Sequence, residues 1–170
     1  MRPAAFLDRD NTITEGGTVN TPEEYEAKPF REGAVEALQL LQAKGYALIV
    51  VSNQGGVGLG YMTDSALCAQ HLVLFDRLAR EGVHLTSIRC CHHRPDAGCE
   101  CRKPKPGLIL EQARKFNIHL PSSVMIGDMQ TDVEAGVAAG VGRNYLLESW
   151  PKFDLGRPTR VASALDASPE

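Results

Sequence analysis

The chain has 170 residues, of which 43% are hydrophobic, and it carries a formal net charge of −3. This length predicts a single compact domain over residues 1–170, because domains most often contain roughly 100 to 150 residues. The net negative charge argues against extended nucleic-acid binding, which needs a basic surface. No apolar stretch approaches the roughly 20 residues that cross a bilayer. We therefore expect a monomer in the cytoplasm, with neither nucleic acid nor a membrane as its partner.

Five short apolar segments are predicted to be β-strands, and segments of helical periodicity separate them. The strands are predicted at residues 4–7, 46–51, 85–91, 124–127 and 144–147. The helices are predicted at residues 35–41, 65–80, 108–116 and 131–139, with Gly45 ending the first of them in a left-handed conformation. This alternation predicts an α/β fold with an open, doubly wound parallel sheet, whose ligand site lies beyond the carboxyl ends of the strands.

Two segments fall outside this alternation. Residues 14–29 are polar and too few for a cap domain, so we expect a flap beside the site. The C-terminal tail, from about residue 150 to residue 170, is loosely patterned. It either adds a strand around residues 160–162 or frays.

Two aspartates, Asp8 and Asp10, directly follow the first predicted strand. Two negative charges at the end of a buried strand need a cation, and Mg²⁺ accepts one or two carboxylates while leaving room for phosphate oxygens. One aspartate can then attack phosphorus, and Asp10 can serve as general acid and base. A polar turn that closes the strand explains the same residues equally well when they are taken alone.

A second acidic pair follows the fourth predicted strand. Asp128 lies at the tip of that strand and is the natural third carboxylate for a metal. Asp132 lies four residues further on, at the start of a predicted helix. It either caps this helix or supports the metal site, and the sequence favours neither.

Groups that can bind phosphate follow the second strand and precede the helix at 108–116. Ser52 and Asn53 stand before a glycine-rich loop, although an ordinary strand-to-helix turn has the same composition. Arg102, Lys103 and Lys105 form a basic run. Such a run is usually a solvated surface, but the nearby carboxylates favour a role for Lys103 or Lys105 at the site.

Four of the five cysteines lie between residues 90 and 101, beside two histidines. This crowding is typical of a metal site in a reduced compartment rather than of a disulfide framework. Three thiolates and one imidazole suit tetrahedral Zn²⁺, and the predicted ligands are Cys90, His92, Cys99 and Cys101. Cys91 and His93 are the alternatives in the doubled sequence, because alternate residues of an extended segment face the same way. Four protein ligands imply a structural zinc, and a metal-free loop with reactive thiols is the remaining alternative.

The chain resembles the haloacid dehalogenase (HAD) superfamily in four motifs that occur in the expected order. They are Asp-x-Asp-x-Thr at 8–12, a strand ending in Ser52, Lys103, and Gly-Asp-x-x-x-Asp at 127–132. The sequences Phe-Leu-Asp-Arg-Asp, Ser-Asn-Gln and Cys-Arg-Lys-Pro resemble the heptose bisphosphate and histidinol phosphate phosphatase group more narrowly, at residues 6–10, 52–54 and 101–104. The resemblance implies a capless, Rossmann-like HAD fold with a zinc-binding loop, and Mg²⁺-dependent hydrolysis of phosphomonoesters.

The resemblance also implies a role for each matching residue. The implied catalytic residues are the nucleophile Asp8, the acid and base Asp10, the phosphate ligand Ser52 and the charge partner Lys103. The implied Mg²⁺ ligands are Asp8, the backbone carbonyl of Asp10 and Asp128, with Asp132 in support. Asn53 and Arg102 are implied to bind substrate, Arg102 through a second anionic group.

The resemblance further implies a small phosphorylated metabolite as substrate. Removal of the 7-phosphate of D-glycero-D-manno-heptose 1,7-bisphosphate is the first expectation, and histidinol phosphate or another small sugar phosphate is the alternative. The heptose phosphatases carry an arginine where this chain has Leu59. A non-catalytic zinc-binding interaction module is a more distant alternative, because it leaves Asp8, Asp10 and Asp128 unexplained.

Overall fold

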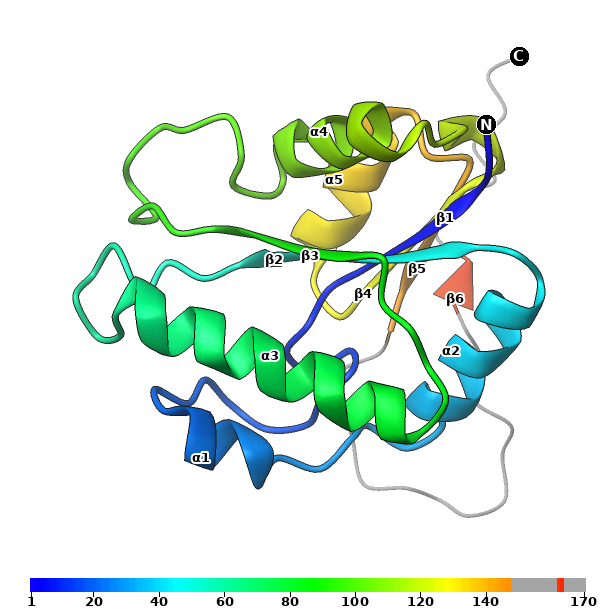
Figure 1. The fold of residues 1–170 in the computed structure, drawn as a ribbon. Helices are drawn as coiled ribbons and strands as arrows, with labels where there is room; N and C mark the ends of the chain where they lie inside the picture. Colours follow the sequence, from blue (N-terminus) through cyan, green and yellow to red (C-terminus); the bar gives the residue numbers. More distant parts are fainter. Residues whose placement is uncertain (148–161, 164–170) are drawn as a thin grey trace.

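The computed structural model describes residues 1–147 and 162–163, which form a three-layer α/β fold (Figure 1). The sheet has the strand order β3-β2-β1-β4-β5-β6. The strands are β1 (Ala4–Leu7), β2 (Ala47–Asn53), β3 (Ser87–Cys91), β4 (Val124–Gly127), β5 (Arg143–Leu146) and β6 (Ala162–Ser163). The pairs from β3 to β5 are parallel, and β6 runs antiparallel to β5. The predicted parallel sheet is confirmed.

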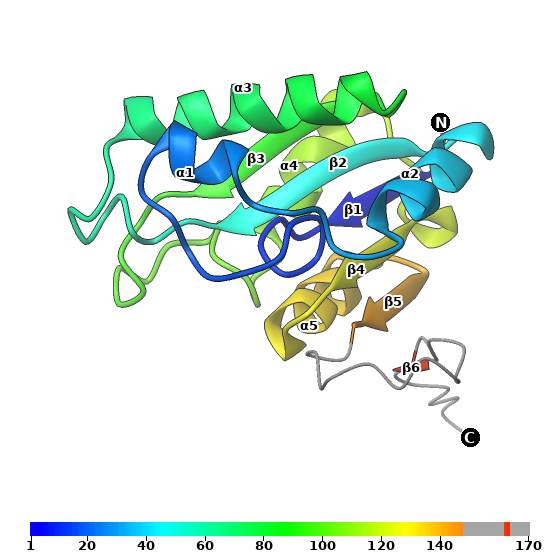
Figure 2. The ribbon, with the colours of Figure 1, turned by 90° about the horizontal axis from the view of Figure 1, so that it is seen from below.

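Helices cover both faces of this sheet, as Figures 1 and 2 show. They are α1 (Pro22–Glu26), α2 (Ala34–Ala43), α3 (Asp64–Arg80), α4 (Gly107–Phe116) and α5 (Gln130–Ala139), with a 3₁₀ turn at Leu120–Ser122. Helices α4 and α5 lie on one face, and α1, α2 and α3 lie on the other. The four predicted helices are therefore present, and α1 is an addition within the predicted flap.

The core is divided by the sheet, because successive side chains of a strand point to opposite faces. In β1, Ala4 and Phe6 belong to the cluster under α4 and α5, whereas Ala5 and Leu7 belong to the cluster on the side of α2 and α3. All four residues are at most 2% exposed. This central strand therefore reads as a continuous apolar run, as is typical of a parallel sheet covered on both faces.

Local capping signals set the ends of several helices. Thr63 accepts a hydrogen bond from the backbone of Ala66 at the start of α3, and Thr21 and Glu24 form a capping box at the start of α1. Gly45 follows α2 with a φ of 84°, which confirms its predicted left-handed conformation.

Of the predicted C-terminal tail, residues 150–170, the structure describes Ala162 and Ser163. The strand β6 begins at Ala162, the last residue of the segment in which a tail strand was considered. The remainder of the predicted tail lies outside the described residues. Among the described residues, no helix combines the length and apolarity needed to cross a membrane.

The order of the strands in the sheet determines where the candidate site lies. Strand β1 lies between β2 and β4, so the carboxyl ends of these three strands meet at one edge of the sheet. The chain leaves β1 at Asp8, β2 at Asn53 and β4 at Asp128. Ligands of open α/β sheets bind in the crevice at such a point.

Candidate active site

Three carboxylates meet beyond β1 and β4. Oxygen atoms of Asp8, Asp128 and Asp132 all lie within 4.8 Å of one another. Asp8 is held by its backbone N–H, which donates to the carbonyl of Ile126 at 3.0 Å, and Asp132 stands in the first turn of α5. Close carboxylate oxygens are the donor set that a hard cation such as Mg²⁺ requires. The structure thus brings Asp132 directly beside the other two, whereas the Asp10 side chain lies outside this group.

A buried lysine reaches into the same group. The Lys103 Nζ lies 2.7 Å from Asp8 Oδ1 and 2.5 Å from Asp132 Oδ1, and it donates to the carbonyl of Val51 at 2.7 Å. Its side chain is only 2% exposed. Lys105, by contrast, forms an exposed ion pair with Glu100 and lies away from the carboxylates. The structure therefore decides between the two lysines that the sequence offered.

The Asn53 amide positions the backbone of Lys103. Its Nδ2 donates to the carbonyl of Lys103, and its Oδ1 accepts from the backbone N–H of Lys103, both at 3.0 Å. Ser52 precedes it at the end of β2, where its buried hydroxyl accepts a hydrogen bond from Gln54 Nε2 at 2.9 Å. Asn53 thus links β2 to the backbone of Lys103 rather than presenting a free amide.

Charge is unevenly distributed over the carboxylate group. Burial, together with Asp8 and Asp132, raises the pKa of Asp128 to about 6. Burial also raises the pKa of Asp132, and Lys103 opposes this effect only in part. Burial by itself would lower the pKa of Lys103, but Asp8 and Asp132 raise it, so the amine stays charged. Lys103 carries one positive charge, and the three carboxyl groups can carry three negative charges, so a bound cation would be favourable here.

Asp10 occupies a separate, strongly positive environment. Its Oδ2 accepts hydrogen bonds from Arg9 Nη2 at 3.0 Å and Gln54 Nε2 at 2.8 Å, and its Oδ1 accepts one from Lys28 Nζ at 3.0 Å. Burial would raise the pKa of Asp10, but Arg9 and Lys28 outweigh burial and lower it. The carboxylate is therefore held ionised and fixed in orientation.

The two bases beside Asp10 are themselves anchored. The fully buried Arg9 donates to Gln70 Oε1 at 3.1 Å, and its guanidinium lies 4.8 Å from the centre of the Tyr25 ring. The Lys28 Nζ also donates to the carbonyls of Gly16 at 3.2 Å and Gly17 at 2.9 Å, which ties the flap to Asp10. Sequence reasoning missed both bases. The sequence offers one signal for each of them: Arg9 lies between two aspartates, and Lys28 is a lysine within the polar flap.

Backbone geometry explains two residues of the acidic motifs. Asn11 has a φ of 60°, a left-handed conformation that asparagine and glycine tolerate best. Gly127 precedes Asp128, and a Cβ there would collide with the carboxylate of Asp132. Glycine at this position therefore lets α5 bring Asp132 up to the end of β4.

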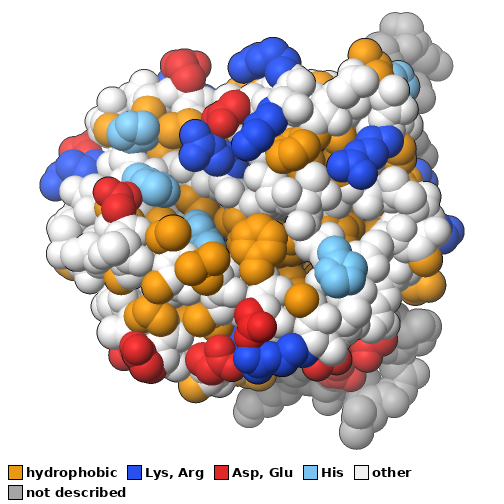
Figure 3. Space-filling model, viewed as in Figure 1, with side chains coloured by type: hydrophobic (Ala, Val, Ile, Leu, Met, Phe, Trp, Pro, Cys, Tyr) orange, Lys and Arg blue, Asp and Glu red, His pale blue; other side chains and the backbone are white. Residues whose placement is uncertain are grey.

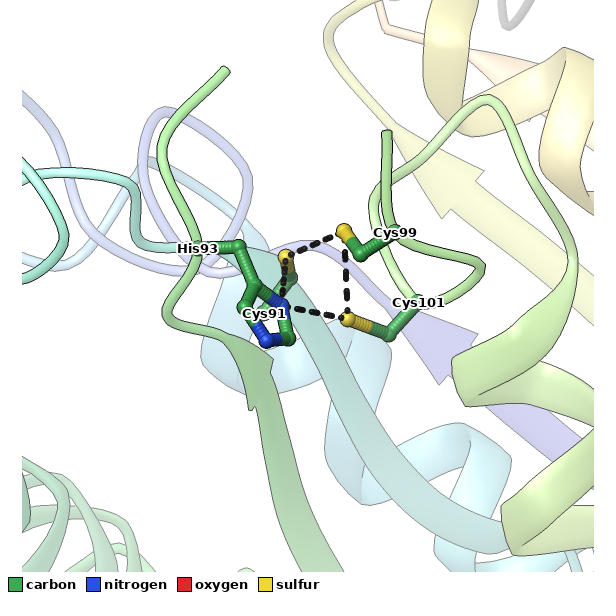
Figure 4. A group of neighbouring side chains, drawn as sticks. All are labelled: Cys91, His93, Cys99 and Cys101. Atoms are coloured by element: carbon green, nitrogen blue, oxygen red, sulfur yellow. Dashed lines mark hydrogen bonds between the residues drawn. The ribbon is translucent and has the colours of Figure 1, made fainter. Parts of the chain in front are cut away.

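A cysteine and histidine cluster lies beside this site, and its residues differ from those predicted. The side chains of Cys91, His93, Cys99 and Cys101 point toward one another, with all ligand atoms within 4.8 Å (Figure 4). His93 Nδ1 lies 3.2 Å from Cys101 Sγ, and Cys91 Sγ lies 3.6 Å from Cys99 Sγ. Three thiols and one imidazole match the donor set of a closed tetrahedral zinc site.

The predicted zinc ligands Cys90 and His92 lie one residue away from the members of this cluster, Cys91 and His93. Cys91 is buried in the core cluster under α4, on the face from which the loop returns with Cys99 and Cys101. Cys90 faces the other way, 3.4 Å from His71 Nε2, and His92 pairs with Asp64 at 2.7 Å. Burial raises the pKa of Cys90 to about 12 and so keeps it a thiol. Because alternate residues of a strand face the same way, the sequence allows two pairs, Cys90 with His92 or Cys91 with His93. The pair that begins on the face of β3 covered by α4 is the one that joins Cys99 and Cys101.

The zinc loop, residues 90–101, packs against the loop that follows β2. A Cβ on Gly58 would collide with the backbone of His92 and Arg94, so the two loops approach closely. Arg102 lies next to Gly55, and its buried Nη1 has no hydrogen-bond partner among the described residues. In Figure 3, histidine side chains gather where β3 ends and α3 begins, and acidic and basic side chains are interspersed around them.

Comparisons with known proteins agree on one kind of enzyme. A family model described as HAD-hydrolase-like matches residues 100–143. The D-glycero-beta-D-manno-heptose-1,7-bisphosphate 7-phosphatase of Helicobacter pylori is 42% identical over 85% of this chain and 83% of its own. The Escherichia coli protein of the same name is 36% identical over 86% and 80%. The crystal structure of a D,D-heptose 1,7-bisphosphate phosphatase from B. bronchiseptica, complexed with magnesium and phosphate, is similar with a TM-score of 0.77. It is 30% identical and covers 86% of this chain and 80% of that chain.

Proposed function

Because the chain belongs to the heptose bisphosphate phosphatases of the HAD superfamily, and is therefore a phosphatase, we propose that it removes the 7-phosphate of D-glycero-D-manno-heptose 1,7-bisphosphate. The observation that carries the proposal is the contact of Asp8 with Lys103 beside two further carboxylates, in a chain whose relatives bear this activity in their names. We also propose that the enzyme acts as a monomer in the cytoplasm, where its free cysteines stay reduced.

Asp8 is the nucleophile in this proposal. One of its carboxylate oxygens attacks the phosphorus atom, a phospho-aspartate forms, and the bond to the sugar oxygen breaks. Lys103 stabilises the charge of Asp8 and of the transferred phosphoryl group, because its Nζ already lies 2.7 Å from Asp8. The Ser52 hydroxyl lies at the adjacent strand end and contributes a hydrogen bond to a phosphoryl oxygen.

Asp10 serves both half-reactions. To act as an acid, Asp10 must first take up a proton against the low pKa that its neighbours give the resting carboxylate, and it then gives this proton to the departing sugar oxygen. As a base, it takes a proton back from the water that attacks phospho-Asp8. That second step releases inorganic phosphate and regenerates Asp8. Arg9, Gln54 and Lys28 hold the carboxylate in one orientation, ready for the basic role.

Two metal ions fit the chain at different places. Asp8, Asp128 and the backbone carbonyl of Asp10 would hold Mg²⁺, which when bound neutralises charge on the phosphate oxygens. Asp132 supports this site by pairing with Lys103 and by accepting from the backbone of Met129 at 3.0 Å. Zn²⁺ would be held by the four residues of the cysteine and histidine cluster and would brace the loop that leads into Arg102 and Lys103.

Arg102 is the group best placed for the second phosphate of a bisphosphate. Its buried Nη1 lacks a partner among the described residues, and a buried guanidinium nitrogen without a partner is costly. A phosphate on the far end of the sugar would satisfy it. The absence of a cap domain, which we expect from the sequence, leaves the flap, the loop after β2 and the zinc loop to form the rim of the site.

A phosphate-release panel with added Mg²⁺ tests this function. The substrates are the α and β anomers of heptose 1,7-bisphosphate, histidinol phosphate and simple sugar monophosphates. We expect kcat/KM to be at least about tenfold higher for one heptose bisphosphate than for the other compounds, which corresponds to about 1.4 kcal/mol in the transition state. Comparable slow turnover of all substrates would reject the heptose assignment, and a preference for histidinol phosphate would replace it.

The variant Asp8→Asn separates the chemistry from the choice of substrate. It removes the nucleophilic charge with little change in shape, so we expect a folded protein without turnover of any substrate. Retained turnover in a variant with the same far-ultraviolet circular dichroism spectrum as the unaltered protein would refute Asp8 as the nucleophile.

A further inference from the structure

The side chain of Gln54 lies between two of the proposed catalytic residues. Its Nε2 is 2.8 Å from Asp10 Oδ2 and 2.9 Å from Ser52 Oγ. Gln54 is only 4% exposed and Ser52 only 2%, so water competes little for these contacts. One amide group therefore connects the carboxylate that follows β1 to the hydroxyl at the end of β2.

The contact with Asp10 determines which way the Gln54 amide faces. An ionised carboxylate only accepts hydrogen bonds, so the amide presents its nitrogen rather than its oxygen to Asp10. This nitrogen carries two hydrogens, and the two contacts use both of them: one goes to Asp10 Oδ2 and the other to Ser52 Oγ. The Ser52 oxygen is thereby the acceptor in its pair with Gln54.

The hydroxyl hydrogen of Ser52 consequently points elsewhere. Among the described residues, no group accepts a hydrogen bond from Ser52 Oγ. A buried donor without an acceptor is unfavourable, and a phosphoryl oxygen bound beside Asp8 would supply the acceptor. Leu7 pairs with Val50 in the sheet, so Asp8 and Ser52 follow this pair by one and two residues at the same edge.

The backbone of Gln54 is anchored separately from its side chain. Its N–H donates at 2.8 Å to the carbonyl of Cys91, the last residue of β3, and its carbonyl accepts from the backbone N–H of Val57 at 3.3 Å. The amide is therefore held at both ends before any substrate arrives. Little conformational entropy remains to be lost at this side chain when substrate binds.

We propose that Gln54 is a positioning residue of the phosphatase, whose two amide hydrogens hold Asp10 Oδ2 and direct the Ser52 hydroxyl hydrogen toward the phosphoryl group. The inference rests on the proposed function, in which Asp8 attacks phosphorus and Ser52 binds a phosphoryl oxygen. A donor whose direction is set in advance needs no reorganisation as the transition state forms. Gln54 should therefore contribute more to kcat than to substrate binding.

The variant Gln54→Met tests the proposal, because it keeps the length of the side chain and removes both amide hydrogens. With Mg²⁺ present, we expect kcat to fall at least tenfold while KM changes less than threefold. A folded Gln54→Met protein with kcat within twofold of the unaltered protein would overturn the proposal. A higher KM with unchanged kcat would also overturn it, because it would assign Gln54 to substrate binding alone.

A second variant covers the case in which Gln54→Met does not fold. Gln54→Glu keeps the shape of the side chain, but its carboxylate repels Asp10 and accepts the Ser52 hydrogen in place of the phosphoryl group. We expect kcat to fall at least as far as the tenfold expected for Gln54→Met. Retained kcat in Gln54→Glu would refute the positioning role by itself.

Gln112 on α4 provides a matched control. It is 0% exposed, and its Oε1 accepts a hydrogen bond from Ser87 Oγ at 2.8 Å, so it is also a buried glutamine paired with a serine. Ser87 begins β3 and therefore lies at the edge of the sheet opposite the carboxylates. Gln112→Met should lower the temperature of unfolding and leave kcat and KM within twofold. Equal falls of kcat in Gln112→Met and Gln54→Met would show that Gln54 acts only through stability.

A double-mutant cycle with Ser52→Ala tests the link between the two side chains. If Gln54 acts partly through Ser52, the fall of kcat caused by Gln54→Met should be at least threefold smaller in the Ser52→Ala protein than in the unaltered protein. The contact with Asp10 accounts for the effect that remains. The same fall of kcat in both proteins would refute the direction of the Ser52 hydroxyl by Gln54.

The unaltered protein separates a failure of this inference from a failure of the proposed function. All variants are compared on the phosphate ester that the unaltered protein turns over fastest, so a preference for histidinol phosphate rejects the heptose assignment without affecting the comparison. No turnover of any ester by the unaltered protein would refute both proposals. Turnover that is equal in the unaltered protein and in Gln54→Met would refute the role of Gln54 alone.

Discussion

At the scale of single residues, the site separates two kinds of carboxylate. Asp8 and Asp132 pair with the buried Lys103 and Asp128 lies beside them, whereas Asp10 is surrounded by Arg9, Lys28 and Gln54. The first group has too little positive charge until a cation binds, and Asp10 has a surplus. Asp8 and Asp10 lie two residues apart in the sequence, and their different surroundings allow them to perform different chemistry.

Replacing Lys28 tests how Asp10 is controlled. Lys28→Met removes a positive charge 3.0 Å from Asp10, so the pKa of Asp10 should rise from its lowered value. Where Asp10 acts as a base, the acidic limb of the kcat profile should then move to higher pH. We also expect kcat to fall at least about tenfold, or about 1.4 kcal/mol, with a smaller change in KM. Lys28→Arg keeps the charge and should retain the original profile; an unshifted limb in Lys28→Met would show that the flap lysine does not tune Asp10.

His71 predicts a specific dependence of stability on pH. Burial and the charge of Arg9 lower the pKa of His71 from 6.5 to about 4. A histidine with a depressed pKa contributes stability that is complete above pH 6.5 and is lost as the pH falls toward 4, at up to about 1.4 kcal/mol per pH unit. Urea unfolding at pH 7 and pH 5 should therefore show a larger loss of stability for the unaltered protein than for His71→Gln. Equal losses would mean that other groups carry the pH dependence.

At the scale of elements, the loop of residues 90–101 connects β3 to Arg102 and Lys103, the residues proposed to bind phosphate. It leaves the sheet after Cys91, returns at Cys99 and Cys101, and continues directly into Arg102 and Lys103. Zn²⁺ bound by these side chains would fix both ends of the loop and with them the position of Lys103 Nζ.

Two neighbouring cysteines provide a matched test of the zinc register. Cys91→Ser removes a member of the cluster, so we expect it to lose the bound zinc, about one equivalent per chain, and to unfold at lower temperature. Cys90→Ser changes a thiol that faces His71, so zinc should be retained. Zinc content is measured by plasma mass spectrometry after gel filtration. Loss of zinc in Cys90→Ser with retention in Cys91→Ser would restore the register predicted from the sequence.

At the scale of the whole molecule, a metal ion bound by Asp8, Asp128 and Asp132 would be coupled to stability. Asp128 lies beside Asp8 and Asp132, and burial and these two carboxylates raise its pKa to about 6, so ionising Asp128 costs more free energy in the folded state than in the unfolded state. An acid with a raised pKa loses its stabilising contribution as the pH rises through that value. Repulsion among the carboxylates therefore destabilises the metal-free fold at neutral pH, and Mg²⁺ bound among them would relieve it.

Thermal unfolding measures this coupling. At 100 times its Kd, Mg²⁺ should stabilise the protein by about 2.7 kcal/mol, or on the order of 5 to 10 °C for a domain of this size. Asp128→Asn should raise Tm in the absence of Mg²⁺ and should lose most of the response to the ion. Calcium-free buffer and the variant Glu36→Gln, which changes an exposed acid on α2, serve as controls. A full Mg²⁺ response in Asp128→Asn would exclude Asp128 as a ligand.

The order of the strands and helices, and the identity of most groups at the candidate site, follow from local sequence patterns. Apolar runs separated by helical periodicity define strands and helices locally, and right-handed crossovers then force the carboxyl ends of β1, β2 and β4 to one edge. That is why Asp8, Ser52 and Asp128 could be assigned together before any coordinates. The four motifs added Lys103, which a local pattern could not distinguish from Lys105.

Two features of the site depend instead on packing between distant segments: the face of β3 on which each cysteine lies, and the charged partners of Asp10. Cys90 and Cys91 are equivalent in sequence, and the packing of α4 on one face of β3 made Cys91 the member of the cysteine and histidine cluster. Lys28 is remote from Asp10 in sequence, and the folding of the flap brought its Nζ to 3.0 Å. Local preferences fix an element and its periodicity, but contacts between distant segments depend on how the layers pack, which is a property of the whole chain.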